Sequence, residues 1–301
     1  RGEFRIGEYG FDTVKYWFGA TDYKHNEVDV IAGINDIGSR FKNREMESRM
    51  ELSHLPMSTF LGEMRGVFGV QWGNRELSVN GAEDLLLPAS VRSVAAFVFE
   101  EFKLSEKLKL QASGRLDHIG VEGTGAIFPA SLLPPPTHPT LFNVDRIYQP
   151  ASASVGLLYS LPYNMTARLT AQHVERAPDA IELFYKGPHD TPRTFEIGDP
   201  NMKLEKANTI EAGLKRNEGE FRFELSAYYT QFTNFIFKDF TGAKCNDTFA
   251  SCGNPKGSFD QIKYTQRDAT FYGAEAQAEH DVAPVWAGVW GVAGQYDFVH
   301  A

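Results

Sequence analysis

The stretch E-F-R-F-E-L-S-A-Y-Y at residues 220–229 alternates between two kinds of side chain. Phe221, Phe223, Leu225, Ala227 and Tyr229 occupy the odd positions, and charged or polar residues occupy the even ones. Because successive side chains of a β-strand point to opposite faces, this segment predicts a strand with one apolar and one polar face.

The same alternation recurs in other segments, namely residues 107–117, 165–172, 210–215 and 272–279. A soluble β-sandwich also alternates, but two features favour a membrane barrel. Many strands span roughly 10–15 residues, which exceeds the usual globular length and covers the ~9–11 that a tilted membrane strand needs. The apolar face also holds small residues, such as Ala274, Ala276 and Ala278, which would fill a sandwich core poorly.

A third feature is the order of the connections, which alternate between short and long. We expect short ones near residues 56–61, 105–107, 161–164, 217–219 and 282–284. We expect long ones near residues 24–38, 80–90, 120–147, 176–205 and 238–261. Outer-membrane barrels combine short periplasmic turns with longer outer loops. The long connections should therefore face the outside of the cell.

These patterns predict an all-β fold, a transmembrane antiparallel β-barrel that occupies residues 1–301 as one domain. About eleven strands follow one another, or twelve if residues 1–7 are the tail of another. We expect the chain to be truncated at both ends, because it begins in a strand and stops in an apolar stretch. Aromatic residues near strand ends suggest girdles at the two lipid–water interfaces: Tyr16, Trp17, Trp72, Tyr159, Tyr228, Tyr229, Phe232, Phe235 and Tyr272.

Composition and motifs exclude several other classes. No apolar run reaches the ~18 residues of a helical membrane span. The net charge of −9 and a pI near 5.4 disfavour nucleic acid as a partner, and also adhesion to anionic lipid through a basic patch. The sequence contains no HExxH, GxSxG or phosphate-binding glycine loop, so we predict no enzyme.

Cys245 and Cys252 are separated by six residues in a polar segment. This spacing suggests a local disulfide, which an oxidising compartment would allow. Two free thiols remain an alternative. A zinc site fits less well, because structural zinc sites usually need four ligands.

One set of motifs points to a family. The sequence has E-R-A-P at 175–178, E-L-F-Y at 182–185, G-D-P-N at 198–201, a strand with Glu211 followed by Gly213-Leu214, and N-F-I at 234–236. This order resembles the barrel of a TonB-dependent receptor. The residues that match its motifs are Arg176, Pro178, Asp199, Pro200, Asn201 and Glu211. Arg176 could hold the loop by bidentate pairing with a carboxylate.

The resemblance implies a 22-stranded barrel in the outer membrane of a Gram-negative bacterium, surrounded by lipid. It also implies a plug domain, which is not in this chain, and energy supplied by the TonB complex through that plug. The implied function is active transport of an extracellular cargo, with no prosthetic group.

Within the family, two subgroups are similar. Haem receptors pair F-R-A-P with N-P-N-L and use a histidine between the two boxes. This chain has Glu175 in place of Phe and D-P-N-M at 199–202 in place of N-P-N-L, and His189 lies between the boxes. The zinc-uptake receptors are a closer likeness, in E-R-A-P, in G-P-H at 187–189 and in D-Y-K-H at 22–25.

Two expected outer loops offer the imidazoles and carboxylates that zinc prefers. One contains His25, Glu27 and Asp29, and the other contains His189 and Asp190, with Glu196 and Asp199 further along. We therefore predict uptake of a metal ion, with Zn²⁺ favoured. The alternative is haem or a ferric siderophore, with an axial histidine and an apolar slot formed by Phe184, Tyr185 and Phe195. An outer-membrane barrel enzyme or an adhesin is the alternative from another class.

Overall fold

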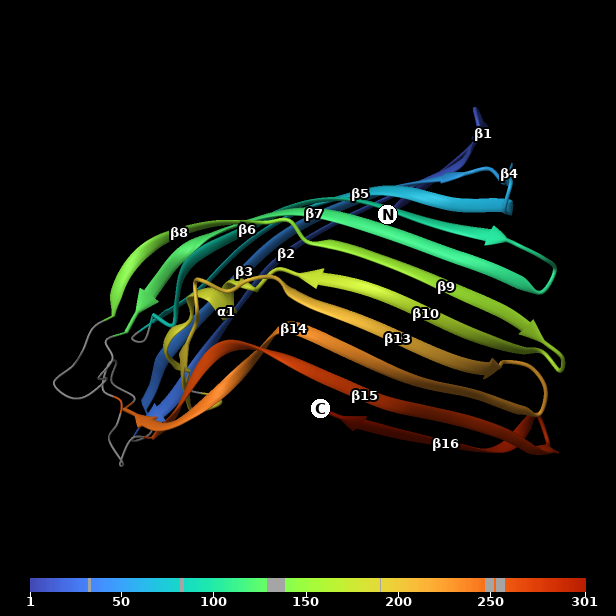
Figure 1. Ribbon diagram of the computed structural model, residues 1–301. Helices are drawn as coiled ribbons and strands as arrows, with labels where there is room; N and C mark the ends of the chain where they lie inside the picture. Colours follow the sequence, from blue (N-terminus) through green and yellow to red (C-terminus); the bar gives the residue numbers. More distant parts are fainter. Residues whose placement is uncertain (32–33, 82–83, 129–138, 190, 247–251, 253–257) are drawn as a thin grey trace.

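The computed structural model describes residues 1–301 except 32–33, 82–83, 129–138, 190, 247–251 and 253–257, and also leaves out the side chains of 29–31 and 34–36. The strands form one curved, 16-stranded sheet (Figure 1). They are β1 (Gly2–Glu8), β2 (Phe11–Ile31), β3 (Ile34–His54), β4 (Met57–Thr59), β5 (Gly62–Gly81), β6 (Leu86–Lys103), β7 (Leu108–Ile127), β8 (Thr140–Tyr148), β9 (Ala151–Leu161), β10 (Met165–Arg176), β11 (Lys186–His189), β12 (Thr194–Ile197), β13 (Glu205–Arg216), β14 (Phe221–Cys245), β15 (Phe259–Val285) and β16 (Gly288–His300).

The wall of the sheet is an antiparallel meander in which each strand pairs with its neighbour in the chain. Its twelve strands are β1, β2, β3, β5, β6, β7, β9, β10, β13, β14, β15 and β16. Short β4 and β8 pair with β5 and β7, and α1 (Ala180–Phe184), β11 and β12 are inserted between β10 and β13. The predicted all-β fold, a partial transmembrane barrel, is confirmed. The twelve strands of the wall agree with the predicted eleven or twelve.

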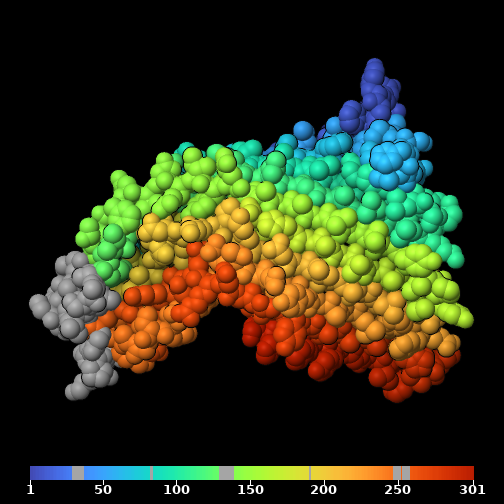
Figure 2. All heavy atoms as spheres, in the orientation of Figure 1, coloured from blue at the N-terminus to red at the C-terminus, as the bar shows by residue number. Residues whose placement is uncertain are grey.

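The register places the predicted apolar positions on one face of the wall. Neighbouring strands pair Leu225 with Leu214 and Ala276, and pair Tyr229 with Ile210 and Tyr272. Many large apolar side chains of this parity are 40% or more exposed, among them Phe18, Met50, Phe68, Trp72, Val94, Leu116, Val155, Leu169, Ile210, Leu225, Tyr229 and Tyr272. In a soluble protein such a surface would be buried, so it is the lipid-facing, outward face of the wall. Figure 2 shows how successive strands lie side by side to form the curved wall.

The outward apolar positions define a membrane belt of constant height. It runs over Phe221–Tyr229 of β14, Val94–Phe102 of β6 and Leu108–Leu116 of β7, which is nine residues in each strand. This length matches the roughly 9–11 residues of a tilted membrane strand. The strands then continue past the belt at one end, which we call the outer end.

Charged and polar pairs line the opposite, inner face within the belt. Arg115 donates to Asp117 at 2.7 and 2.8 Å, and Arg222 donates to Asp281 at 2.7 and 2.8 Å. Such pairs satisfy the charges of a polar lumen, which is the normal interior of an outer-membrane barrel.

His54 and Glu100 are an exception on the outward face. His54 Nε2 lies 3.0 Å from Glu100 Oε2, and the two side chains meet across the intervening strand at Gly66. A Cβ on Gly66 would lie 2.1 Å from the same carboxylate oxygen. The glycine therefore lets the two groups pair, and pairing lowers the cost of ionisable groups at the lipid boundary.

Three sequence expectations are wrong in detail. The strands are longer than predicted, up to 25 residues in β14 and 27 in β15, because they continue beyond the membrane belt and keep pairing there. The expected long loop at 24–38 is largely the paired ends of β2 and β3. The expected turn at 282–284 lies inside β15, which extends to Val285. Among the described residues, no helix is long and apolar enough to cross a membrane.

Part of the set of aromatic residues predicted to form the girdle lies on the outward face, as a girdle requires. Tyr16, Trp72, Tyr159, Tyr229 and Tyr272 are 42–45% exposed on the outward face. Trp17 and Tyr228 have the opposite parity in their strands and therefore lie on the inner face. The rings of Phe232 and Phe235 pack on the Phe271 ring, with centroid distances of 5.3 and 5.2 Å. Aromatic identity near a strand end thus did not identify the face, whereas alternation did.

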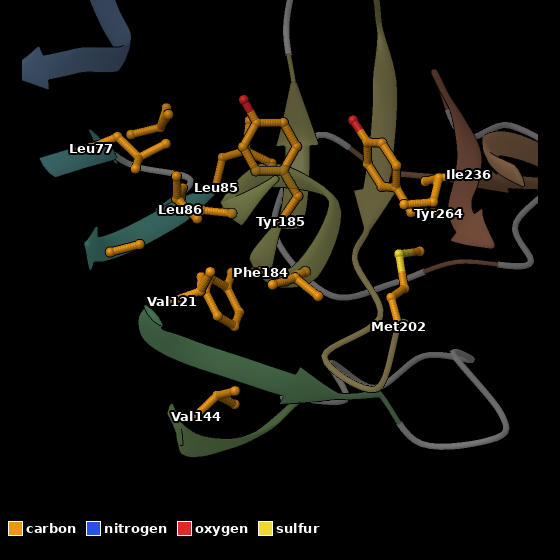
Figure 3. Close-up of a cluster of buried hydrophobic side chains, with 14 of the residues drawn as sticks. Leu77, Leu85, Leu86, Val121, Val144, Phe184, Tyr185, Met202, Ile236 and Tyr264 are labelled. Carbon is orange, nitrogen blue, oxygen red and sulfur yellow. The ribbon is translucent and has the colours of Figure 1, made fainter. Parts of the chain in front are cut away.

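Buried apolar residues gather on the inner face at the outer end, where the inserted segment covers the wall (Figure 3). Leu183, Phe184 and Tyr185 of the insertion are 1–7% exposed. They belong to one cluster with Leu77, Leu85, Leu86, Val121, Val144, Met202, Ile236 and Tyr264. The insertion is therefore a folded element docked inside the barrel.

Candidate functional site

The E-R-A-P motif starts the insertion and fastens it to the wall. Asp179 caps α1 and forms a capping box with Glu182. Arg176 donates to Glu182 at 2.9 and 3.3 Å and to Glu205 of β13 at 3.1 and 3.2 Å. Pro178 precedes the cap. The two forked ion pairs join both ends of the insertion, so the geometry gives Arg176 a structural role.

The D-P-N motif forms the returning turn. Asp199 Oδ1 accepts a hydrogen bond from the backbone N–H of Asn201 at 2.8 Å, and Asn201 Oδ1 accepts one from Arg146 at 2.8 Å. Met202 is buried, and its carbonyl accepts from the Tyr148 hydroxyl at 3.0 Å. Asp199, Pro200 and Asn201 therefore fix the loop to β8. Glu211 lies elsewhere, paired with Arg168 on the inner face of the membrane belt.

Between these motifs, β11 and β12 form a hairpin that is added to the wall. β12 pairs in parallel with β15, from Thr194 opposite Asp260 to Ile197 opposite Lys263. Cys245 and Cys252 form a disulfide, which packs with Phe195, Ile197 and Phe259. This pairing and packing hold the hairpin at a fixed position on the wall.

The hairpin brings His189 to the two predicted residues of β2. Its Nε2 lies 3.8 Å from Glu27 Oε1, which also accepts a hydrogen bond from Thr191 at 2.6 Å. The His25 ring stacks on Phe41 with centroids 4.3 Å apart, and Phe41 lies 5.8 Å from the His189 ring. Three predicted residues from segments more than 160 positions apart thus share one small region.

Glu196 anchors this region. Its side chain is fully buried and accepts hydrogen bonds from Thr194 at 2.9 Å, Tyr264 at 2.8 Å, and Lys238 at 3.1 Å, and its Oε1 lies 3.0 Å from His189 Nδ1. Burial alone would raise the pKa of Glu196, but the hydrogen bonds from His189, Tyr264 and Lys238 lower it to about 2. As an ionised acceptor it holds the Nδ1 proton of His189, which leaves Nε2 directed toward Glu27.

Two polar side-chain atoms in the region are buried without a hydrogen-bond partner. They are His25 Nδ1 and Glu27 Oε2. Such orphaned groups cost free energy unless a further ligand or water satisfies them. The predicted ligands Asp29 and Asp190 cannot be placed in this region, because the Asp29 side chain and residue 190 lie outside the described residues. The described side chains hold no group of three or more His, Cys, Asp or Glu arranged to hold a metal ion.

The apolar slot suggested for haem is not present in this arrangement. Phe184, Tyr185 and Phe195 are 1%, 7% and 0% exposed, because they pack in the two hydrophobic clusters. Their rings therefore hold the insertion together and do not line an open surface.

Sequence reasoning did not identify Lys238, Tyr264 or Phe41 as parts of this region. Lys238 and Tyr264 are direct neighbours across β14 and β15, in parts of those strands that lie beyond the membrane belt. The sequence-based strands ended near the belt, so nothing aligned these residues with Glu196. The register shift between Phe232 and Phe235 also interrupts the alternation there, so no local pattern pointed to Lys238.

The twelve-stranded wall, its lipid-facing belt and its polar interior define the barrel of an outer-membrane protein. The chain belongs to the family described as "TonB dependent receptor-like, beta-barrel", whose sequence profile matches residues 4–301. TonB-dependent receptors are a family of Gram-negative outer membranes. The predicted family is therefore confirmed.

Solved structures show the same fold. The chain is similar to the copper transporter OprC, with 19% sequence identity, a TM-score of 0.70, and coverage of 99% of this chain and 45% of that one. It is similar to the Serratia marcescens hemophore receptor HasR, with 15% identity, a TM-score of 0.68, and coverage of 97% and 46%. The ferric enterobactin receptor PfeA gives 14% identity, a TM-score of 0.62, and coverage of 97% and 42%. The chain thus spans less than half the length of these receptors.

Proposed function

We propose that this chain is part of an outer-membrane receptor, not an enzyme, that takes up a metal ion. Zinc is the favoured cargo, and the TonB complex supplies the energy through a plug outside this chain. The observation that supports this proposal most is the meeting of His25, Glu27 and His189, because His25 and Glu27 each carry a buried polar atom without a hydrogen-bond partner.

The imidazole and carboxylate groups of this region suit a metal ion of intermediate softness. Imidazole nitrogen and carboxylate oxygen bind Zn²⁺, and imidazole also binds copper ions. The two cysteines are joined in a disulfide and supply no thiolate. Two or three protein ligands completed by water would capture an ion and still release it, as transport requires. Asp29 and Asp190 remain proposed contributors from the same two segments.

Haem or a ferric chelate is the second candidate. Two of the similar structures are those of a hemophore receptor and a ferric enterobactin receptor, and a third is that of a copper transporter. The burial of Phe184, Tyr185 and Phe195 favours the bare ion over haem for this chain.

The test is metal binding by the intact receptor with His189→Ala or His25→Ala. We expect each change to weaken zinc binding by about 10- to 100-fold, because each removes a proposed ligand. His118→Ala is the matched control, since His118 is an exposed histidine of β7 on the outward face. Calorimetric titration with zinc, copper and haem in parallel measures the effect.

The outcomes separate the candidates. Loss of zinc binding in both site variants, with the control unchanged, supports zinc. A larger loss for copper than for zinc assigns copper instead. Unchanged affinity for both ions, or a haem spectrum that disappears in His189→Ala alone, would overturn the metal-ion proposal.

A further inference from the structure

The hydrogen-bond donors to Glu196 crowd one of its two carboxylate oxygens. Oε1 accepts from the Thr194 hydroxyl at 2.9 Å and from the Lys238 ammonium at 3.1 Å, and it lies 3.0 Å from His189 Nδ1. Oε2 accepts from the Tyr264 hydroxyl at 2.8 Å and lies 3.0 Å from the Lys238 ammonium. A carboxylate oxygen offers about two lone pairs, so the donors to Oε1 have to share them. His189 therefore binds an oxygen that is already occupied.

Lys238 differs from the other donors in charge and in exposure. It lies in β14 opposite Tyr264 of β15, and Glu196 lies on the far side of β15, in β12. The ammonium lies over the Tyr264 ring, 5.3 Å from its centroid, and reaches the carboxylate across that strand. The Lys238 side chain is 44% exposed, whereas that of Glu196 is fully buried. Lys238 thus brings a positive charge from a solvent-exposed position to a carboxylate that other side chains already bind.

The charge of Glu196 is important because the carboxylate lies behind His189. A carboxylate that accepts the second ring N–H of a metal-binding histidine makes the imidazole a stronger ligand. His189 Nδ1 faces Glu196, and Nε2 faces Glu27 on the side where the proposed metal ion binds. An ammonium on the same oxygen offsets part of the carboxylate charge and competes for its lone pairs. His189 should therefore be a weaker ligand than Glu196 alone would make it.

We propose that Lys238 lowers the metal affinity of the site by acting through Glu196, and that it thereby makes the bound ion easier to release. This inference rests on the proposed function, because it takes His189 as a ligand of the metal ion. Lys238 is a positioning residue and not a ligand. A transport site has to release the ion that it captures, and a shared carboxylate meets this need without the loss of a ligand. Removal of the lysine should tighten binding, whereas removal of a purely structural residue would weaken it.

The experiment measures zinc affinity and zinc dissociation with the intact receptor in detergent, at about pH 8, where protons compete little with the metal for imidazole. We expect Lys238→Met to bind zinc about tenfold more tightly and to release it about tenfold more slowly, the lower end of the effect of an outer partner on a metal-binding histidine. Methionine keeps an apolar stem over the Tyr264 ring but carries no charge. Lys238→Arg keeps the charge and should bind zinc as the unsubstituted receptor does.

Lys244→Met is the matched control. Lys244 lies in the same strand, is 43% exposed and pairs with Asp260, so the change removes the same charge at a similar exposure and leaves the partners of Glu196 in place. Its zinc affinity should be unchanged. In a Glu196→Gln background, Lys238→Met should alter zinc affinity by less than about twofold, because the charge through which the lysine acts is absent there.

Amide hydrogen exchange of residues 186–189 and 194–197 checks that the hairpin stays docked in each variant. Unchanged or weaker zinc binding by Lys238→Met would overturn the proposal, and weaker binding with faster exchange would assign the lysine a purely structural role. An equal gain in Lys244→Met, or in the Glu196→Gln background, would overturn it as well, since the lysine would then act through net charge or directly on the ion. An unsubstituted receptor without zinc affinity would overturn the proposed function, and this inference with it.

Discussion

Ala276→Arg is expected to destabilise the assembled barrel by about 2–4 kcal/mol, the cost of an arginine on the lipid face near the middle of a bilayer. Ala276 lies halfway along the belt portion of β15, between Leu225 and Tyr296 in the register. A guanidinium there cannot reach either interface without distorting the lipid, so the cost is large. Urea unfolding of the intact receptor in lipid vesicles measures the change.

Gln277→Arg is the matched control, because Gln277 is the next residue and faces the inner side. It pairs in the register with Glu224, so an added cation there has an acid beside it and contact with a wet lumen. We expect a change within about 0.5 kcal/mol, as for an ordinary exposed position. Similar unfolding curves for the two variants would show that the faces had been assigned wrongly.

Glu196→Ala is expected to release the β11–β12 hairpin from the wall, at a cost of about 3–5 kcal/mol in local stability. The change removes the shared acceptor of Lys238, Tyr264 and His189, and leaves a buried hydroxyl and an ammonium without their partner. Hydrogen exchange of the backbone amides of residues 186–189 and 194–197 should then speed up by on the order of a hundredfold or more.

Glu196→Gln keeps the shape and one acceptor oxygen, so we expect a smaller effect than in Glu196→Ala. Glu224→Ala is the matched control, because Glu224 is half-exposed and lies 3.5 Å from Lys215 on the inner face of the belt. Its removal should leave exchange in the hairpin unchanged. Slow exchange in Glu196→Ala would mean that strand pairing with β15 alone holds the hairpin.

The same carboxylate gives the hairpin a pH dependence. The folded pKa of Glu196 is about 2, below its ordinary value of 4.5. A depressed carboxyl pKa stabilises the folded state fully above 4.5, and this contribution is lost as the pH falls from 4.5 toward 2. The protection of these amides, taken relative to the intrinsic exchange rate at each pH, should therefore also fall in the unsubstituted protein over that acidic range.

The wall of the barrel could be predicted from sequence because it depends on a local rule. Alternation in residues 220–229 assigns the faces of β14 without knowledge of any partner strand, and each neighbour repeats the rule. The ends of the strands could not be predicted in this way. Beyond the belt the outward residues change from Phe18 and Ala20 to Asp22 and Lys24, so the apolar signal stops while the pairing continues.

The candidate site could be predicted only in part, for a related reason. His25, Glu27 and His189 were identifiable by ligand chemistry within the two expected loops. The network of Glu196, by contrast, depends on a parallel pairing of β12 with β15 that joins residues more than 60 positions apart. Such non-local pairing leaves no local pattern in either segment.

The central claim is that alternate side chains of one strand face lipid and a wet lumen. Spin labels placed singly at Leu225, Ser226, Ala227 and Tyr228 of the intact receptor in lipid vesicles test it most directly, through collision with oxygen and with a water-soluble nickel chelate. The account predicts high oxygen accessibility at Leu225 and Ala227 and low oxygen accessibility at Ser226 and Tyr228. Equal accessibility at all four positions, or the opposite alternation, would contradict it.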